Sequence, residues 1–262
     1  MLTRSAVPQA ESSGLPLSEI AYQTLRGKIL RCEFEPGVKL KIDTLQRDHG
    51  LSSSPLREAL NRLVTEGLVR ADERRGFWAA SVSVADLRDV TRLRLMLDCE
   101  ALEESIKRGD DAWEARIVSA QHWLVKIEGR AESAKPGAPL TLNADWSVRH
   151  KDFHMALLSA SSSPKLLGLC SGLFDQAERY RRLSMRYRKE PRHKSAEHRR
   201  IMDAVIGRDK AAALALLREH TSRTADNVEA AMEKAEKAEK AEMADKVQSL
   251  AEYKKTARRA GA

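Results

Sequence analysis

The chain has 262 residues, which is too long for one minimal domain and fits a small module joined to a larger one. Its 46 Lys and Arg residues exceed its 38 Asp and Glu residues by eight, a balance that favours an anionic partner such as nucleic acid without requiring one. An aromatic content of 5% argues against an aromatic-rich β-sandwich and against a protein that stacks single-stranded bases. The longest apolar run, residues 211–217, is far shorter than the roughly 20 residues of a membrane span, so we expect a cytoplasmic protein without a membrane partner.

The N-terminal part begins with residues 1–16, whose Pro, Ser and Gly content without an apolar period predicts a disordered leader. Apolar residues then recur every three or four positions and predict an amphipathic helix that Pro36-Gly37 ends. These apolar residues are Leu17, Ala21, Leu25, Ile29 and Cys32. We expect Asp43 to cap a short second helix that stops at Gly50.

A third helix is predicted directly after this turn. Ser54 is expected to be its N-cap, Pro55 suits its first position, and Gly67 ends it. Residues 68–70 and 77–82 are expected to be short strands on either side of a turn. One helix, a helix-turn-helix pair and a small β-hairpin wing make a winged helix-turn-helix over residues 17–82, in which the second helix of the pair enters the major groove.

The second part of the chain is predicted to be entirely helical. Ser83 and Asp86 fit a capping box at its start, and residues 83–230 show helical periodicity without strand signals. Loops are expected at residues 136–139, 161–164 and 190–192. The fold class is therefore mainly α, with a winged helix-turn-helix followed by an all-α helical bundle. Residues 231–262 contain Lys-Ala-Glu repeats and are expected to form a charged tail, either helical or disordered.

Three sequence runs in the first part carry a specific pattern. They are Glu35-Pro-Gly-Val-Lys-Leu40, the Ser-Pro-Leu-Arg-Glu-Ala-Leu run of residues 54–60, and Glu66-Gly-Leu-Val69. Together they resemble the DNA-binding domain of the GntR family of transcription regulators over about residues 18–82. The resemblance implies a double-stranded DNA partner. Well-known members carry arginines where this chain has Asp43 and Ser53, so the resemblance implies no particular operator sequence.

The predicted DNA contacts lie at the start of the recognition helix and at the wing tip. They are Ser52, Ser53, Ser54, Arg57, Asn61, Arg74, Arg75 and Gly76. Arg57 lies in the first turn, where a guanidinium can reach guanine or a phosphate, and its alternative is a surface arginine paired within its own helix. Serine hydroxyls and helix N-terminal amides suit phosphate anchoring. The wing arginines suit minor-groove or phosphate contact, or they are solvated loop charges.

The second part resembles the FCD domain of FadR-like GntR regulators over about residues 86–225. The matching residues are Arg94-Leu-Met-Leu-Asp98, Phe153-His154, Glu197-His198 and His220. The resemblance implies a homodimer, formed through residues 83–230, that binds a palindromic operator and responds to a small carboxylate metabolite. Arg94 is the expected effector-binding residue because a guanidinium grips a carboxylate with two bonds, and the alternative is a salt bridge with Asp98.

Four histidines form a candidate metal site. His150 and His154 are four residues apart and share a helix face, whereas His198 and His220 lie on two further predicted helices. Imidazole ligands favour zinc or nickel over calcium. Family members usually have an aspartate where this chain has His150, and the alternative is that these are core or surface histidines.

Three classes of function were compared: a transcription regulator, a metal-dependent hydrolase and a non-specific DNA-binding protein. We expect a ligand-responsive transcription regulator and not an enzyme, because a metal-dependent hydrolase using the histidines also needs a positioned general base that the spacing does not reveal. A non-specific DNA-binding protein is disfavoured because residues 18–80 hold 11 basic and nine acidic residues. Residues 179–200 hold ten basic and two acidic residues, and they predict a solvated face, an anion pocket or a surface that approaches DNA.

Overall fold

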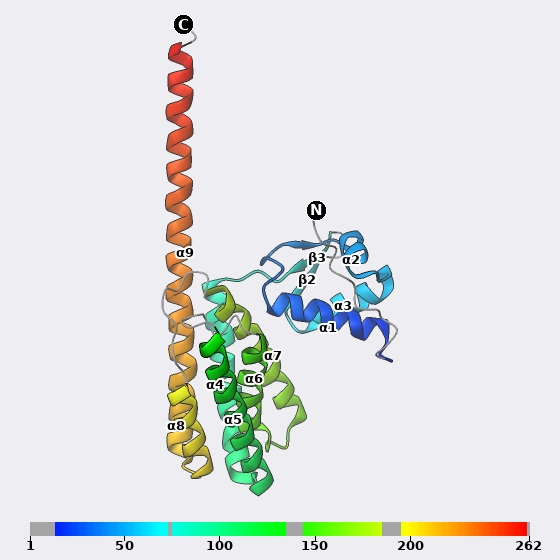
Figure 1. The fold of residues 1–262 in the computed structure, drawn as a ribbon, viewed down its shortest axis with the longest axis vertical. Coiled ribbons are helices and arrows are strands. Elements are labelled where there is room, and N and C mark those ends of the chain that lie inside the picture. Colours follow the sequence, from blue (N-terminus) through cyan, green and yellow to red (C-terminus); the bar gives the residue numbers. More distant parts are fainter. Residues whose placement is uncertain (1–13, 73–74, 135–143, 185–194, 261–262) are drawn as a thin grey trace.

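The computed structural model describes residues 14–72, 75–134, 144–184 and 195–260. A small N-terminal group of helices and strands lies beside a helical bundle, and the last helix of the bundle projects far beyond it (Figure 1). The fold is mostly helical with one three-stranded sheet, so the predicted fold class is confirmed. Within the described ranges, no helix is both long and apolar enough to cross a membrane.

The N-terminal group is a winged helix-turn-helix. Its elements are α1 (Leu17–Leu30), β1 (Lys39–Leu40), α2 (Ile42–His49), α3 (Ser53–Thr65), β2 (Val69–Asp72) and β3 (Gly76–Ala79). The strands are antiparallel in the order β1-β3-β2, with Trp78 of β3 opposite Lys39 on one side and Arg70 on the other. Leucines from all three helices fill the core beneath the sheet, which fixes the exposed face of α3.

Two predicted helix boundaries in this group are wrong. The first helix ends at Leu30 and not at Pro36-Gly37, because the backbone turns through a left-handed conformation at Cys32 with φ 56°. The second helix begins after Lys41, so Asp43 lies in its first turn, where its charge suits the helix dipole, and does not cap it. Its predicted end at Gly50 is confirmed, with φ 65°.

The start of α3 and the extent of the sheet also differ from the prediction. The N-cap position belongs to Ser52, so Ser54 lies inside the first turn and Pro55 is the third helical residue. Because the first three amides of a helix have no partner in it, proline costs no hydrogen bond there. The wing has a third strand, β1, and β3 ends at Ala79 instead of residue 82. A two-residue strand is too short to show an alternating pattern in the sequence.

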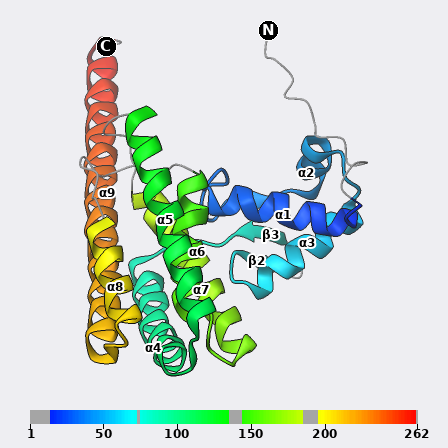
Figure 2. The ribbon, with the colours of Figure 1, turned by 60° about the horizontal axis from the view of Figure 1, so that its bottom comes forward.

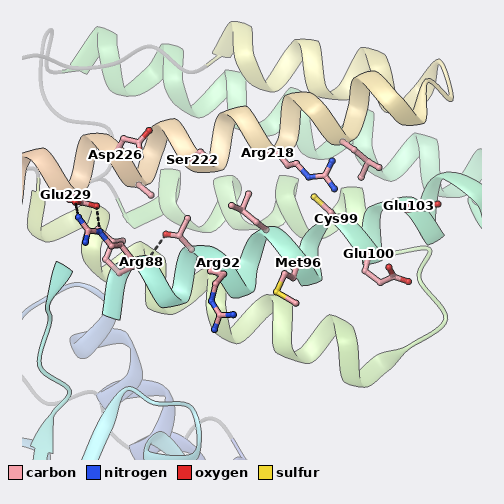
Figure 3. A pocket seen from close by; sticks show the side chains of 15 residues that line it. Arg88, Arg92, Met96, Cys99, Glu100, Glu103, Arg218, Ser222, Asp226 and Glu229 are labelled. Carbon is pink, nitrogen blue, oxygen red and sulfur yellow. Dashed lines mark hydrogen bonds and ion pairs between the residues drawn. The ribbon is translucent and has the colours of Figure 1, made fainter. Parts of the chain in front are cut away.

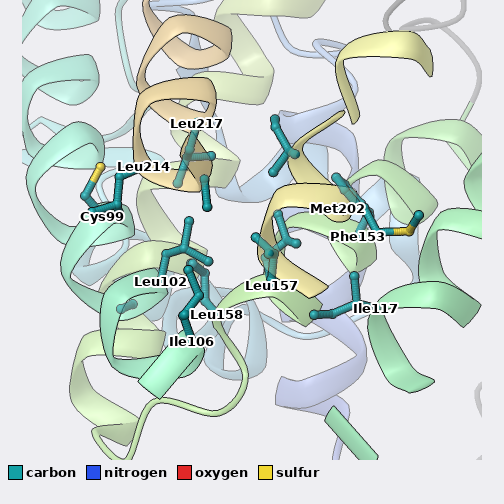
Figure 4. Packing of buried hydrophobic residues seen from close by; sticks show 14 of the residues in the cluster. Cys99, Leu102, Ile106, Ile117, Phe153, Leu157, Leu158, Met202, Leu214 and Leu217 are labelled. Atoms are coloured by element: carbon teal, nitrogen blue, oxygen red, sulfur yellow. The ribbon is translucent and has the colours of Figure 1, made fainter. Parts of the chain in front are cut away.

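Within the described residues, six helices form the second group. They are α4 (Val84–Arg108), α5 (Asp111–Ala134), α6 (Ala144–Leu158), α7 (Pro164–Ser184), α8 (Ser195–Ile206) and α9 (Lys210–Ala260). Large buried side chains such as Leu102, Ile117, Phe153 and Leu157 interdigitate between them (Figure 4). The loop predicted at residues 161–164 is confirmed between α6 and α7, whereas the loops predicted at 136–139 and 190–192 lie outside the described residues.

The start of α4 is tied to α7 by a tyrosine. As predicted, Ser83 Oγ accepts a hydrogen bond from the Asp86 amide, at 3.1 Å. The second half of the predicted capping box is wrong, because the Ser83 amide donates to the Tyr180 hydroxyl at 3.2 Å and that hydroxyl donates to the Asp86 carboxylate. Burial, reinforced by Asp86, raises the pKa of Tyr180 well above its usual range. The hydroxyl therefore stays protonated and holds the connection between the two groups against α7.

Candidate functional site

Helix α3 has one buried and one exposed face. The buried face consists of Leu56, Ala59, Leu60 and Leu63. The exposed face carries Ser53, Ser54, Arg57 and Asn61, which follow one another at helical spacing. The Arg57 side chain forms no hydrogen bond or ion pair with any described residue, so the pairing within the helix that was its alternative is absent there. The exposed N-terminal half of this helix is therefore free to meet a ligand.

The wing tip adds a second exposed basic surface. Gly76 begins β3 with φ 101°, a conformation that strains any residue with a Cβ atom, so the predicted role of glycine in this turn is confirmed. Arg75 is exposed next to it, and Arg74 lies outside the described residues. The ring of Trp78 also lies within 5.1 Å of Lys39 Nζ and 5.4 Å of the Arg70 guanidinium carbon, two cations that were not among the predicted DNA contacts.

The helical bundle brings the four predicted histidines into one cluster. His150 and His154 come from α6, His198 from α8 and His220 from α9, and each is at most 5% exposed. One nitrogen from each ring lies within 4.8 Å of those from the other three. Four imidazoles at this distance form a donor set of the size that a transition-metal ion requires.

A carboxylate orients one of these rings. His220 Nδ1 lies 2.9 Å from Glu197 Oε2, and Arg223 Nη1 lies 3.1 Å from the other oxygen of Glu197. A carboxylate only accepts hydrogen bonds, so Nδ1 of His220 carries the proton and its Nε2 carries the lone pair. This is the arrangement by which carboxylates position histidine ligands around metal ions. The sequence analysis names Glu197 among the residues that match the family pattern, but it does not predict that Glu197 orients His220.

An arginine fixes the ring of His150 differently. Arg181 Nη1 lies 2.9 Å from His150 Nδ1, and a guanidinium only donates, so Nδ1 must accept. The proton of this ring is then on Nε2, which is 3.2 Å from His154 Nε2 and donates to it. The second amino group of Arg181 is paired with Glu178. His150 thus serves as a hydrogen-bonded link between Arg181 and His154 in this arrangement.

The surroundings keep His154 neutral. Burial is the largest cause that lowers its pKa well below the usual value, followed by the neighbouring imidazoles of His220 and His198 and then by Arg94 and Arg181. A histidine binds a metal ion through its unprotonated nitrogen. The environment therefore favours the protonation state that metal binding requires.

Two buried arginines approach the cluster across a phenylalanine. The guanidinium carbons of Arg94 and Arg181 lie 5.0 and 4.9 Å from the centre of the Phe174 ring, which is 5.3 Å from the ring of His154. Arg94 Nη2 lies 3.1 Å from Asp98 Oδ2, so the salt bridge that was the alternative for Arg94 is present. The Nε atoms of both arginines are buried and have no hydrogen-bond partner among the described residues. Donors therefore remain available beside the histidines.

The first arginines of the basic segment, residues 179–200, are buried and not exposed to solvent. Arg179, Arg181 and Arg182 are each between 4 and 6% exposed, and all three lie at the C-terminal end of α7. Burial is the largest cause that lowers the pKa of Arg179 and of Arg181. Among the alternatives predicted for residues 179–200, the buried arginines disfavour a solvated face over the described part of this segment. Residues 185–194 lie outside the described residues.

Helix α7 lies between the histidine cluster and the winged helix-turn-helix and contacts both. Its Asp175 pairs with Arg26 of α1 and, at 2.6 Å, with Lys151 of α6. The Gln176 amide donates to the Glu66 carbonyl at 3.0 Å, and Arg179 donates to the Ala80 carbonyl at 2.7 Å. Figures 1 and 2 show the N-terminal group beside α7, on the side of the bundle away from α9.

A cavity lies within this contact. It has a volume of about 240 Å³, and α1, α6 and α7 contribute its walls. Phe174 and Glu178 line it, and both also belong to the contacts around the histidines. No sequence signal could have found these contacts, because Arg26 and Asp175 are 149 residues apart and the sequence spacing says nothing about which helices meet.

Comparison with known proteins gives the family of both parts. Residues 17–78 match the sequence profile described as bacterial regulatory proteins, gntR family, and residues 89–223 match the FCD domain. The chain is 36% identical over 217 residues to the HTH-type transcriptional regulator BphR of Paraburkholderia xenovorans (strain LB400), covering 80% of this chain and 87% of the relative. It is 33% identical over 215 residues to the HTH-type transcriptional repressor GlaR of Escherichia coli (strain K12), covering 80% and 95%.

A solved structure shares the fold. E. coli McbR/YncC superimposes with a TM-score of 0.67 at 17% identity, over 82% of this chain and 97% of that one. The arrangement of a winged helix-turn-helix beside a helical bundle is thus found in an experimental structure as well.

The contact at α7 leads to a stability prediction. Asp175→Asn removes a carboxylate that is 4% exposed and holds two cations, so we expect the free energy of unfolding to fall by about 1–3 kcal/mol. Denaturant unfolding followed by circular dichroism measures it. Asp152→Asn is the control, because its pair with Arg149 is exposed and should change the free energy by less than about 0.5 kcal/mol. Equal effects of the two variants would contradict the prediction.

Proposed function

Because the chain belongs to the GntR family of bacterial regulatory proteins and carries an FCD domain, we propose that it is a ligand-responsive repressor or activator that binds a palindromic operator as a homodimer. The family and the curated relatives are transcription regulators, which confirms the expectation that the chain is a DNA-binding regulator and not an enzyme. One observation carries the proposal: a single helix, α7, contacts both the winged helix-turn-helix and a buried cluster of histidines and arginines. Such a protein would act in the cytoplasm, where the chromosome is.

The proposed DNA-binding surface is the exposed face of α3 together with the wing, within residues 17–82. Arg57 and Asn61 project from the side of α3 that the core leaves free, so they would meet base edges when the helix enters the major groove. Ser52 and Ser53 lie at the helix N-terminus, where hydroxyls and amides suit a phosphate. Arg75, with Arg74, would contact the flanking backbone or minor groove.

Replacement of Arg57 tests this surface. Arg57→Ala should weaken binding to the operator by about 1–3 kcal/mol, because one charged contact to a base or phosphate is lost. The operator is first selected from the genomic fragments that the purified protein retains, and affinity is then measured by gel-shift titration. Arg116→Ala, an exposed arginine on α5, should leave affinity unchanged. Wild-type affinity in the folded Arg57 variant would count against the proposal.

Three of the four clustered histidines suit a zinc or nickel ion better than the fourth. His154, His198 and His220 would hold the ion. The pairing of His220 Nδ1 with Glu197 supports this, because it leaves Nε2 of His220 unprotonated. His150 fits less well as a fourth ligand. A metal on its Nε2 would place the proton on Nδ1, which then could not accept from Arg181. When bound, the ion would supply a positive centre that attracts a carboxylate.

Metal retention tests this site. After reloading with zinc or nickel and desalting, we expect about one ion per chain in the wild type and a large loss in His198→Ala, because one of three imidazole ligands is removed. His150→Gln should retain more metal than His198→Ala, since His150 is tied to Arg181. His122→Ala, an exposed histidine on α5, is the control. Elemental analysis showing little metal in the wild type, or full retention by His198→Ala, would reject the site.

The proposed effector is a small carboxylate held by Arg94. The pair with Asp98 uses one amino group of Arg94 and leaves its Nε without a partner among the described residues, so the guanidinium can still donate to a second carboxylate. Arg181 offers a second buried guanidinium across Phe174. A ligand bound there would move side chains of α7, and α7 also holds α1 through Asp175, which provides the coupling to the DNA-binding surface.

The role of Arg94 can be tested without knowing the effector. A panel of aliphatic mono-, di- and tricarboxylates is screened for compounds that raise the melting temperature of the wild type. Arg94→Lys should lose most of this shift, because lysine keeps the charge but not the two-bond geometry. Arg108→Gln, exposed at the end of the same helix, should keep it. An unchanged shift in Arg94→Lys would place the carboxylate elsewhere.

A further inference from the structure

Helix α4 presents a second stripe of side chains, away from the histidine cluster. The stripe borders an open groove of about 510 Å³ between α4 and α9 (Figure 3). The α4 residues along it are Leu87, Arg88, Thr91, Arg92, Leu95, Met96, Cys99, Glu100 and Glu103. They recur every three or four positions, as one face of a helix does. Near the middle of this stripe, the apolar side chain of Met96 is 59% exposed, and Leu95 and Leu214 line the same groove.

The charges along this stripe are ordered. Arg88 and Arg92 precede Met96, and Glu100 and Glu103 follow it. Arg92 and Glu100 each lie four residues from Met96, on opposite sides. An antiparallel copy of the same stripe would therefore place arginine opposite glutamate on both sides of the methionine. A parallel copy would place each charge beside its own kind, which is unfavourable.

We propose that a second copy of this chain docks on the groove with its α4 antiparallel to the first, about a twofold axis that passes near Met96. An axis of this kind makes the interface self-complementary, since every contact occurs twice. The two methionines would meet at the centre, with the Arg92 and Glu100 pairs at the rim. This inference rests on the proposed function, which requires a homodimer, and it identifies the surface and orientation of that dimer.

The present partners of these side chains do not oppose this pairing. Arg92 pairs with Asp89 on its own helix, and the two side chains are 67% and 60% exposed. Arg88 pairs with Glu229 of α9, and its side chain is 66% exposed. An exposed pair such as that of Arg92 with Asp89 contributes little free energy, so Arg92 can take up a partner on a second copy at small cost.

The distance from the start of α4 to Met96 agrees with the spacing of two half-sites on DNA. Twelve residues separate Val84, the first residue of α4, from Met96. With a rise of 1.5 Å per residue, a twofold axis at Met96 would place the starts of the two α4 helices about 36 Å apart. The winged helix-turn-helix is attached at that end of each helix. Half-sites one helical turn apart are about 34–36 Å from centre to centre, so the attachment points would match a palindromic operator.

Disulfide cross-linking tests the position of the axis. A residue on a twofold axis meets its own copy, so Met96→Cys should form a covalent dimer on mild oxidation. The experiment uses a Cys99→Ala background, because Cys99 lines the same groove. Leu169→Cys in that background is the control, since Leu169 is as exposed as Met96 but lies on α7. We expect several-fold more covalent dimer from Met96→Cys than from the control on a non-reducing gel.

Charge reversal tests the orientation. Arg92→Glu or Glu100→Arg alone should raise the dimer dissociation constant at least about tenfold, because each places two like-charged pairs in the interface. The double variant should restore dimerisation. Residues 92 and 100 are about 12 Å apart along one helix, so this rescue cannot arise within a single chain. Sedimentation velocity measures the dissociation constants, and circular dichroism checks that each variant is folded.

The outcomes separate this inference from the proposed function when operator binding by the wild type is measured in parallel. A dimer that binds the operator but shows neither the Met96 cross-link nor the charge rescue would overturn the interface and leave the regulator intact. A wild-type monomer at micromolar concentration would overturn the interface and the dimer together. Cross-linking and rescue without any operator binding would support the interface and reject the proposed function.

Discussion

The pairing of buried charges on α7 is the constraint on which the rest of the structure depends. Charged groups leave water at a high cost in free energy and persist inside a protein only with partners. Asp175 finds its partners in α1 and α6, whereas Arg181, further along α7, finds them in Glu178 and His150. The orientation of the DNA-binding group and the tautomer of His150 therefore depend on one helix. In the described part of the chain, no further element lies between the contacts of α7 with the DNA-binding group and its contacts with the histidine cluster.

Sequence periodicity was sufficient for features that repeat along one helix. The exposed face of α3 and the shared face of His150 and His154 follow directly from the spacing of 3.6 residues per turn. It was not sufficient for contacts between helices, such as Arg181 with His150 or Tyr180 with Asp86, because nothing local specifies them. The convergence of His198 and His220 on the first two histidines was reached through the family pattern. Two of the boundary errors fell at Cys32 and Lys41, where a left-handed residue and an uncapped helix start carry weak signals.

The distribution of charge bears on how such a protein selects its DNA. The net charge of +8 is not concentrated in the DNA-binding group, where basic and acidic residues nearly balance. Part of the excess in residues 179–200 is buried in α7 and paired with carboxylates. Non-specific affinity grows with the number of phosphates that are neutralised, so a nearly neutral group has little of it. In the proposed function, recognition would then depend on a few well-placed side chains such as Arg57, and not on a general positive field.

Helix α4 brings the remaining parts together because its faces serve different neighbours. Its first residues are held to α7 through Ser83, Asp86 and Tyr180, next to the end of the wing. Its inward face carries Arg94 toward the histidines, and its outward face carries Met96 only two residues further on. A helix is stiff over this length, so in the proposed function a ligand that moves α4 at Arg94 would also rotate or shift the stripe around Met96. If that stripe meets a second copy, a small movement at the axis is transmitted to both α4 N-termini, and the distance between the two winged helices changes. Under the proposed function, an effector would then have two routes to the DNA, one through α7 within a chain and one through α4 between chains.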